Sequence, residues 1–145
     1  MSGHPYAYIG GPTVGGLTSA LSDDGFMCTS PARPTTPQLR TWRCDGTVAE
    51  QHEIVLISAG DEGHVHVLDT TIVRPSGAPD PAATQQLFRT VAGLVHQADS
   101  TQAAPEQAWA AQHAGRDATA RVGKLALRSQ ATNTANQLEL DAGVR

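Results

Sequence analysis

Hydrophobic and polar positions alternate along the chain in patterns that predict both strands and helices. Residues 53–58, EIVLIS, are apolar on both faces and predict a central strand, and residues 64–73, HVHVLDTTIV, predict its hairpin partner. Residues 39–44, LRTWRC, alternate so that Trp42 and Cys44 share one face of a short strand. These segments predict a sheet built around a hairpin.

A short helix is predicted before this sheet, after a flexible lead-in of residues 1–12. From Thr13 the apolar side chains repeat at helical spacing as far as Leu21, and Gly25 is placed to end the helix. Prolines at positions 31, 34 and 37 follow. They exclude a helix or a central strand, so this stretch is predicted to be an extended surface connector.

Two further helices are predicted in the second half of the chain. Asp80 followed by Pro81 is a helix start signal, because Asp caps the first turn and Pro lacks a donor where none is needed. The apolar stripe of this helix contains Ala83, Leu87, Val91, Leu94, Val95 and Ala98, with Phe88 at its edge. Pro105 is predicted to open the last helix, which Trp109 anchors and Gly115 ends.

The tail predicts a second hairpin, made by residues 120–129 and 136–141 around a polar turn. The expected order is α-β-ββ-αα-ββ. It forms one α+β domain over residues 13–145, with a single antiparallel sheet of four to five strands and the helices packed on one face. Strands do not alternate with helices, which disfavours a doubly wound nucleotide-binding fold.

Composition narrows the functional classes. The 145 residues are 39% hydrophobic and 17% charged, which is typical of one globular domain with a real core. A net charge of −4 with scattered basic residues argues against nucleic acid as a partner, and no apolar run approaches the roughly 20 residues that cross a bilayer. The start MSGHPYAYIGGP does not read as a signal peptide, which fits a cytoplasmic protein or a mature fragment.

The two cysteines, Cys28 and Cys44, bear on which cellular compartment the protein occupies. A bridge between them closes a loop of about 16 residues, worth roughly 3 kcal/mol in the chain-entropy model, around a proline-rich segment with little apolar content. The even count favours a structural disulfide. Two buried reduced thiols in a cytosolic protein are the alternative. Neither the C-x-x-C spacing of a redox site nor a second ligand pair for zinc is present.

Several segments resemble a loose group of proteins. GFMC, the proline-rich spacer, TWRC, the valine-rich hairpin, LFRTVAGL, the helix around Trp109 and GKLALRSQ occur in this order over residues 14–141. The chain in this respect resembles the extracytoplasmic α+β domains of small exported or lipid-anchored actinobacterial proteins of unknown function. The resemblance implies a disulfide and an external location, and it transfers no residues with a chemical role.

The histidines are the main candidates for chemistry. His64 and His66 are two residues apart on a predicted strand, so both side chains leave one face at a spacing that metal ligands use, and His52 on the neighbouring strand is a third candidate. Asp69 points to the other face of a regular strand and is a poor ligand for this set. The alternative is simple strand alternation, in which Val65 and Val67 point inward and the imidazoles lie on a solvent-exposed face or at the end of the sheet.

Other candidate segments carry weaker signals. Asp61 and Glu62 are adjacent acids at a turn, where exposed carboxylates are common and a general acid needs a pocket. The glycine-rich GGPTVGG before the first helix lacks the Lys and Ser/Thr of a phosphate loop. Trp42 and Trp109 are expected to anchor the core. The alternative is that one of the two tryptophans lines a ligand groove between the sheet and the helices. No cofactor motif is present.

Three functions are therefore carried forward. The first is a non-enzymatic extracytoplasmic or secreted module that binds a protein or small-molecule ligand on the sheet face left open by the helices, including His64 and His66, with Trp109 as a further candidate binding residue. The second is a cytoplasmic chaperone-like interaction module. The third is a small metal-dependent or acid–base enzyme that uses His64, His66 and His52.

Overall fold

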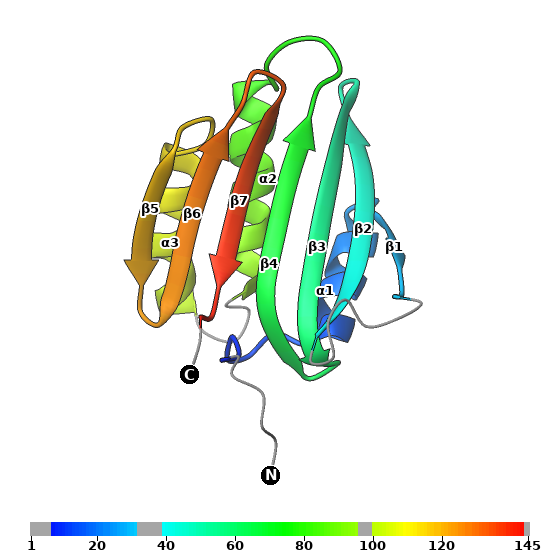
Figure 1. Ribbon diagram of the computed structural model, residues 1–145, viewed down its shortest axis with the longest axis vertical. Helices are drawn as coiled ribbons and strands as arrows, with labels where there is room; N and C mark the ends of the chain where they lie inside the picture. The colour runs from blue at the N-terminus through cyan, green and yellow to red at the C-terminus, as the bar shows by residue number, and fades with distance from the viewer. Residues whose placement is uncertain (1–6, 32–38, 96–99, 144–145) are drawn as a thin grey trace.

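The computed structural model describes residues 7–31, 39–95 and 100–143 (Figure 1). Its three helices are α1 (Val14–Asp23), α2 (Pro81–Val95) and α3 (Ser100–Gln112). Its strands are β1 (Met27–Thr29), β2 (Arg40–Val48), β3 (Gln51–Asp61), β4 (His64–Val73), β5 (Ala118–Val122), β6 (Leu125–Ala131) and β7 (Ala135–Asp141).

The strands form one antiparallel sheet in the order β1-β2-β3-β4-β7-β6-β5, with β1 and β5 at its edges (Figure 1). The α+β class with a single antiparallel sheet is therefore confirmed, but the prediction of four to five strands was wrong, because the sheet has seven. The element order is α-ββββ-αα-βββ.

Two local features account for the additional strands. Met27–Thr29, which precedes the three prolines and was expected to belong to the surface connector, pairs with β2 as a strand. Residues 32–38 of that connector lie outside the described residues. Residues 120–129 contain a tight turn, because Val122 pairs with Leu125 and Gly123 takes a φ of +61° that suits a two-residue hairpin turn. This stretch therefore supplies two strands instead of one.

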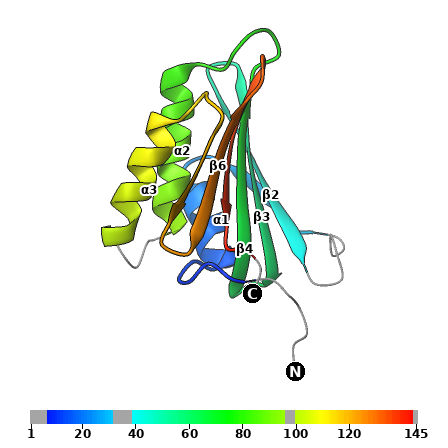
Figure 2. The ribbon, with the colours of Figure 1, turned by 60° about the vertical axis from the view of Figure 1, so that its left-hand side comes forward.

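All three helices lie against the same face of the sheet (Figure 2). Alternate strand residues point into the layer between sheet and helices and form the core with the apolar sides of α1 and α2. Trp42 and Cys44 on β2 are both buried there, as their alternation predicted. The opposite face of the sheet carries none of the described helices (Figure 2).

Helix α2 begins at the predicted residue, and Leu87, Val91 and Val95 of its predicted stripe are buried, but the helix is turned slightly toward the side of Phe88. The Asp80 carboxylate accepts a hydrogen bond from the Ala83 amide at 2.9 Å, which caps the first turn. Phe88, expected at the edge, is fully buried, whereas Leu94 is only partly buried. Ala98 lies outside the described residues. The large aromatic ring has more apolar area to remove from water than a leucine, so its burial sets the orientation of the helix.

The other two helices differ in how well their ends were predicted. Thr13 caps α1, since its hydroxyl accepts from the Gly16 amide at 3.0 Å, and Gly25 follows the helix with a φ of +94°. Helix α3 (Ser100–Gln112) already contains the five residues before Pro105, of which Ala103 and Ala104 are strong helix formers. The prediction that Pro105 opens this helix was wrong.

The N-terminal segment packs beside β4 and the end of β7. The predicted lead-in is described from residue 7 onward, and there the Ile9 amide donates to the Val65 carbonyl at 2.7 Å while its side chain is buried. The Ala7 amide donates to the carbonyl of Gly143 at 3.0 Å. These contacts bring the segments around residues 7–9 and residue 143 together at one end of the sheet.

Candidate functional site

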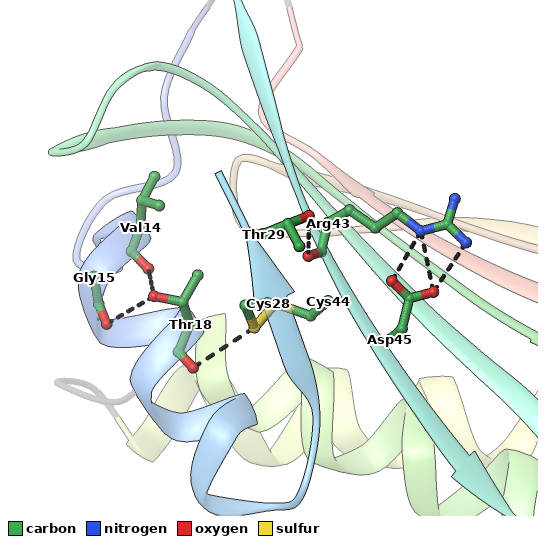
Figure 3. Close-up of a disulfide and its surroundings, with 8 residues drawn as sticks. All are labelled: Val14, Gly15, Thr18, Cys28, Thr29, Arg43, Cys44 and Asp45. Carbon is green, nitrogen blue, oxygen red and sulfur yellow. Dashed lines mark hydrogen bonds and ion pairs between the residues drawn. A yellow bond between two sulfur atoms is a disulfide. The ribbon is translucent and has the colours of Figure 1, made fainter. Parts of the chain in front are cut away.

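The disulfide between Cys28 and Cys44 joins two directly paired residues of neighbouring strands β1 and β2. The bridge lies on the side of β2 that faces α1, where Cys28 Sγ is 3.8 Å from the carbonyl oxygen of Thr18 (Figure 3). Arg43 and Asp45, which alternate with Cys44 along β2, point away from the bridge (Figure 3). The predicted pairing of the cysteines is confirmed, and it marks which face of β2 looks outward.

The face without helices, called the open face below, can be followed from the strand register. Directly paired residues share a face, so one row across the sheet contains Arg43, Leu56, Asp69, Glu139 and Arg128. The neighbouring row contains Asp45, Ile54, Thr71, Gln137 and Gln130. The aliphatic members of this face lie on the central strands and are only partly buried: Ile54, Leu56, Val67 and Val73. The open face thus has an aliphatic centre that also contains Asp69 and Thr71 of β4, and a polar periphery.

A charged cluster borders this aliphatic centre. The Asp45 carboxylate accepts hydrogen bonds from Arg43 Nε and Nη2 at 2.9 Å each and lies 3.0 Å from His52 Nε2 on β3. The bond from Arg43 lowers the pKa of Asp45 below its ordinary value, and the contact with His52 acts in the same direction. The cluster presents a guanidinium and an imidazole held in place by one carboxylate.

The same region is hollowed. A depression of about 400 Å³ has an apolar lining from Ile54, Val73 and Pro75, with Arg43 and His52 at its border. Such a volume is within the range of small-ligand and side-chain pockets. The hollow therefore offers apolar contact and hydrogen-bonding groups side by side.

The turn next to this hollow has an unusual backbone. It connects β2 to β3, and its two central residues, Ala49 and Glu50, have φ angles of 47° and 67°. Residues with side chains rarely adopt this left-handed conformation, which normally favours Gly or Asn. Glu50 also lines the hollow, so the strained turn places a carboxylate at its border.

Acid titration should reveal the role of Asp45. Because the folded-state pKa of Asp45 is lowered, its contribution to stability is present above the unfolded value near 4 and is lost as the pH falls through the folded value. Asp45→Asn should therefore lower the urea midpoint at pH 7, and the difference from wild type should shrink as the pH drops below about 4. Urea unfolding of both proteins over this pH range measures the effect. A constant difference at every pH would show that the carboxylate charge is not responsible.

The structure separates the three histidines that the sequence grouped. His52 pairs with Val73 at one end of β4, whereas His64 is the first residue at the other end, nine residues or roughly 30 Å away along the strand. His64 is exposed and its Nδ1 lies 2.7 Å from Asp61, whose pKa this bond lowers. His66 is buried, and its Nδ1 donates to the Ala7 carbonyl at 2.8 Å.

Trp109 and Asp69, two other residues considered in the sequence analysis, contact neighbouring side chains. Trp109 is partly buried on α3, on the helix side of the sheet, and stacks on His113 with ring centroids 4.5 Å apart. Asp69 accepts from the Gln137 side chain at 2.7 Å on the open face. Over residues 7–31, 39–95 and 100–143, no three His, Cys, Asp or Glu side chains lie close enough to hold a metal ion.

Sequence reasoning missed Arg43 and Asp45. The signal was present, since the two residues are two apart on a strand whose other face was assigned to Trp42 and Cys44. Opposite charges at that spacing lie on one outward face. What the sequence alone does not contain is the register that brings His52 to the same carboxylate.

None of the described helices combines the length and the apolar character needed to cross a membrane. Comparisons with models of protein families, with curated proteins and with solved structures found no match.

Proposed function

We propose that this chain is a non-enzymatic binding module that acts outside the cytoplasm and binds a protein partner through the open face of its sheet. The observation that carries the proposal is the partly buried aliphatic centre of that face, which includes Ile54, Leu56 and Val67. Protein interfaces combine an apolar centre, depleted in charged residues, with a polar rim. The open face has a similar arrangement, except that Asp69, which accepts a hydrogen bond from Gln137, lies beside Leu56 within the centre.

The charged groups around the centre support recognition rather than chemistry. Arg43 pairs with Asp45, and Arg128 Nη2 lies 3.0 Å from Glu139 Oε2 across β6 and β7. These side chains are partly exposed, and rim charges of this kind mainly tune the association rate and the choice of partner. The acid–base and metal alternatives gain no support, because His52 is far from His64 and His66 along the sheet.

The disulfide supports the external location. Structural disulfides persist in oxidising compartments and are rare in the reducing cytosol. Cys44 is fully buried and Cys28 partly buried, so the bridge is a structural link between β1 and β2. This observation favours the extracytoplasmic module over the cytoplasmic chaperone-like alternative.

Site-specific photo-cross-linking tests the proposed face. A photoreactive amino acid placed at position 56 should yield a discrete adduct when the protein is added to the extracellular fraction of the source cells. The same group at position 86, an exposed site on α2, should not yield it. Excess unlabelled wild-type protein should abolish the adduct, whereas excess Leu56→Lys protein should not, because the lysine charge interrupts the apolar centre.

Two results would contradict this proposal. Adduct formation of equal yield from positions 56 and 86 would mean that the open face has no special role. Full competition by the Leu56→Lys protein would mean that the aliphatic centre does not contact the partner. Circular dichroism melting of the Leu56→Lys protein serves as the folding control.

A further inference from the structure

A second, larger hollow lies at the end of the sheet where the N-terminal segment meets the turn between β5 and β6. Its volume is about 610 Å³, within the range of small-ligand pockets. Three parts of the chain line it: residues 7–10, residues 121–125 around the β5–β6 turn, and Ala142 after β7. It is separate from the hollow beside Ile54 and shares no lining residue with it.

The N-terminal wall of this hollow is held by the two histidines that sequence analysis singled out. His66 donates to the carbonyl of Ala7, and the His64 ring packs on Tyr8 with centroids 4.6 Å apart. His64 is held in turn by Asp61. With the backbone bond from Ile9 to Val65, these contacts fix residues 7–9 against β4.

The lining combines apolar surface with positive charge. Ile9 and Leu125 are buried at 6% and 5% exposure, and Val122 and Ala142 are partly buried, so they form an apolar base. Arg121 and Lys124 on the opposite wall are exposed. No carboxylate side chain is among the described lining residues, and neither cation forms an ion pair within the described part of the chain.

The charge here is opposite in sign to that of the whole chain. The net charge of the protein is −4, yet the charged side chains that line the hollow are Arg121 and Lys124, whereas Arg128 farther along the hairpin pairs with Glu139. Cations on an edge strand such as β5 also discourage pairing between sheets. That role requires the charges but not an apolar hollow next to them, so edge protection alone does not explain the arrangement.

We propose that this hollow binds a small amphiphilic anion, with an aliphatic body on Ile9 and Leu125 and a carboxylate or phosphate group between Arg121 and Lys124. Burial of the aliphatic body contributes through the area removed from water, and the guanidinium of Arg121 suits a two-oxygen contact with the acidic group. This site is independent of the proposed protein partner on the open face, so either proposal stands without the other.

Titration of octanoate and of octyl phosphate, followed by ¹⁵N–¹H NMR, tests the site. Saturable shifts are expected at the amides of Ile9, Val122, Lys124 and Leu125. Acetate retains only the carboxylate and 1-octanol only the aliphatic chain, so each should bind at least tenfold more weakly than octanoate. Arg121→Gln/Lys124→Gln should weaken octanoate binding at least tenfold, whereas Arg40→Gln/Arg89→Gln removes two exposed arginines elsewhere and should leave it within twofold of wild type.

The same experiment has outcomes that overturn the proposal. Wild-type affinity in the Arg121→Gln/Lys124→Gln protein would do so, as would shifts confined to the hollow beside Ile54. Sedimentation with phosphatidylglycerol vesicles distinguishes a free amphiphile from a lipid in a bilayer, and binding to vesicles without binding of either free octyl compound would also overturn it. Unchanged thermal melting of both double variants verifies that the fold is intact.

Discussion

Replacing both cysteines by alanine should lower the free energy of unfolding by about 3 kcal/mol, the value expected when a cross-link closing a loop of about 16 residues is lost. The bridge is the covalent link that holds the three-residue edge strand β1 to β2. For a chain of this length, the loss corresponds to a decrease of roughly 10 °C in the melting temperature. Urea unfolding and calorimetry of Cys28→Ala/Cys44→Ala measure both quantities.

Wild-type protein reduced with dithiothreitol is the matched control, because it loses the same link without a change of side chain. Reduction and the double substitution should give the same midpoint within error. Unchanged stability in both would show that the segment from β1 to β2 is held by other contacts. In that case the disulfide would also lose its value as an argument for a location outside the cytoplasm.

Phe88→Ala should be strongly destabilising, with a loss of about 3–5 kcal/mol in the free energy of unfolding. The ring is fully buried where α2 packs on the sheet, and its removal leaves a cavity that the surrounding core fills only in part. Chemical denaturation with fluorescence of the two tryptophans provides the measurement.

Leu94→Ala on the same helix is the control for this prediction. Leu94 is only partly buried, so its truncation should cost clearly less than that of Phe88. The reverse order would mean that α2 packs with the face predicted from the spacing of its apolar residues, which put Leu94 inside and Phe88 at the edge. The pair of variants therefore tests the orientation of the helix directly.

Local patterns predicted much of the fold because several elements carry their own signals. The strand at residues 64–73 and the helix start at Pro81 were predicted at their observed boundaries, since alternation and a capping residue define them without reference to the rest of the chain. The edge strand Met27–Thr29 was missed. It contains only three residues, and its strand conformation depends on pairing with β2 and on the disulfide.

The candidate site was less predictable because it depends on register. The sequence shows that Arg43 and Asp45 share a face, but only the pairing of Thr47 with His52 brings the imidazole to the Asp45 carboxylate. In the same way, the spacing of His64 and His66 suggested metal ligands. An irregularity in the pairing of β3 with β4 and the packing of residues 7–9 direct the two rings to Tyr8 and to the Ala7 carbonyl instead.

The strand order has a consequence for the kinetics of folding. Pairing of β4 with β7 completes the centre of the sheet, although α2, α3 and two strands lie between them in the chain. The side chains of Asp69 and Gln137, which meet across this pair, are 68 residues apart in the sequence. Loop-closure entropy opposes such a distant pairing until late in the reaction. Refolding should therefore take milliseconds to seconds, and the two halves of the sheet should acquire hydrogen-exchange protection before the seam that joins them.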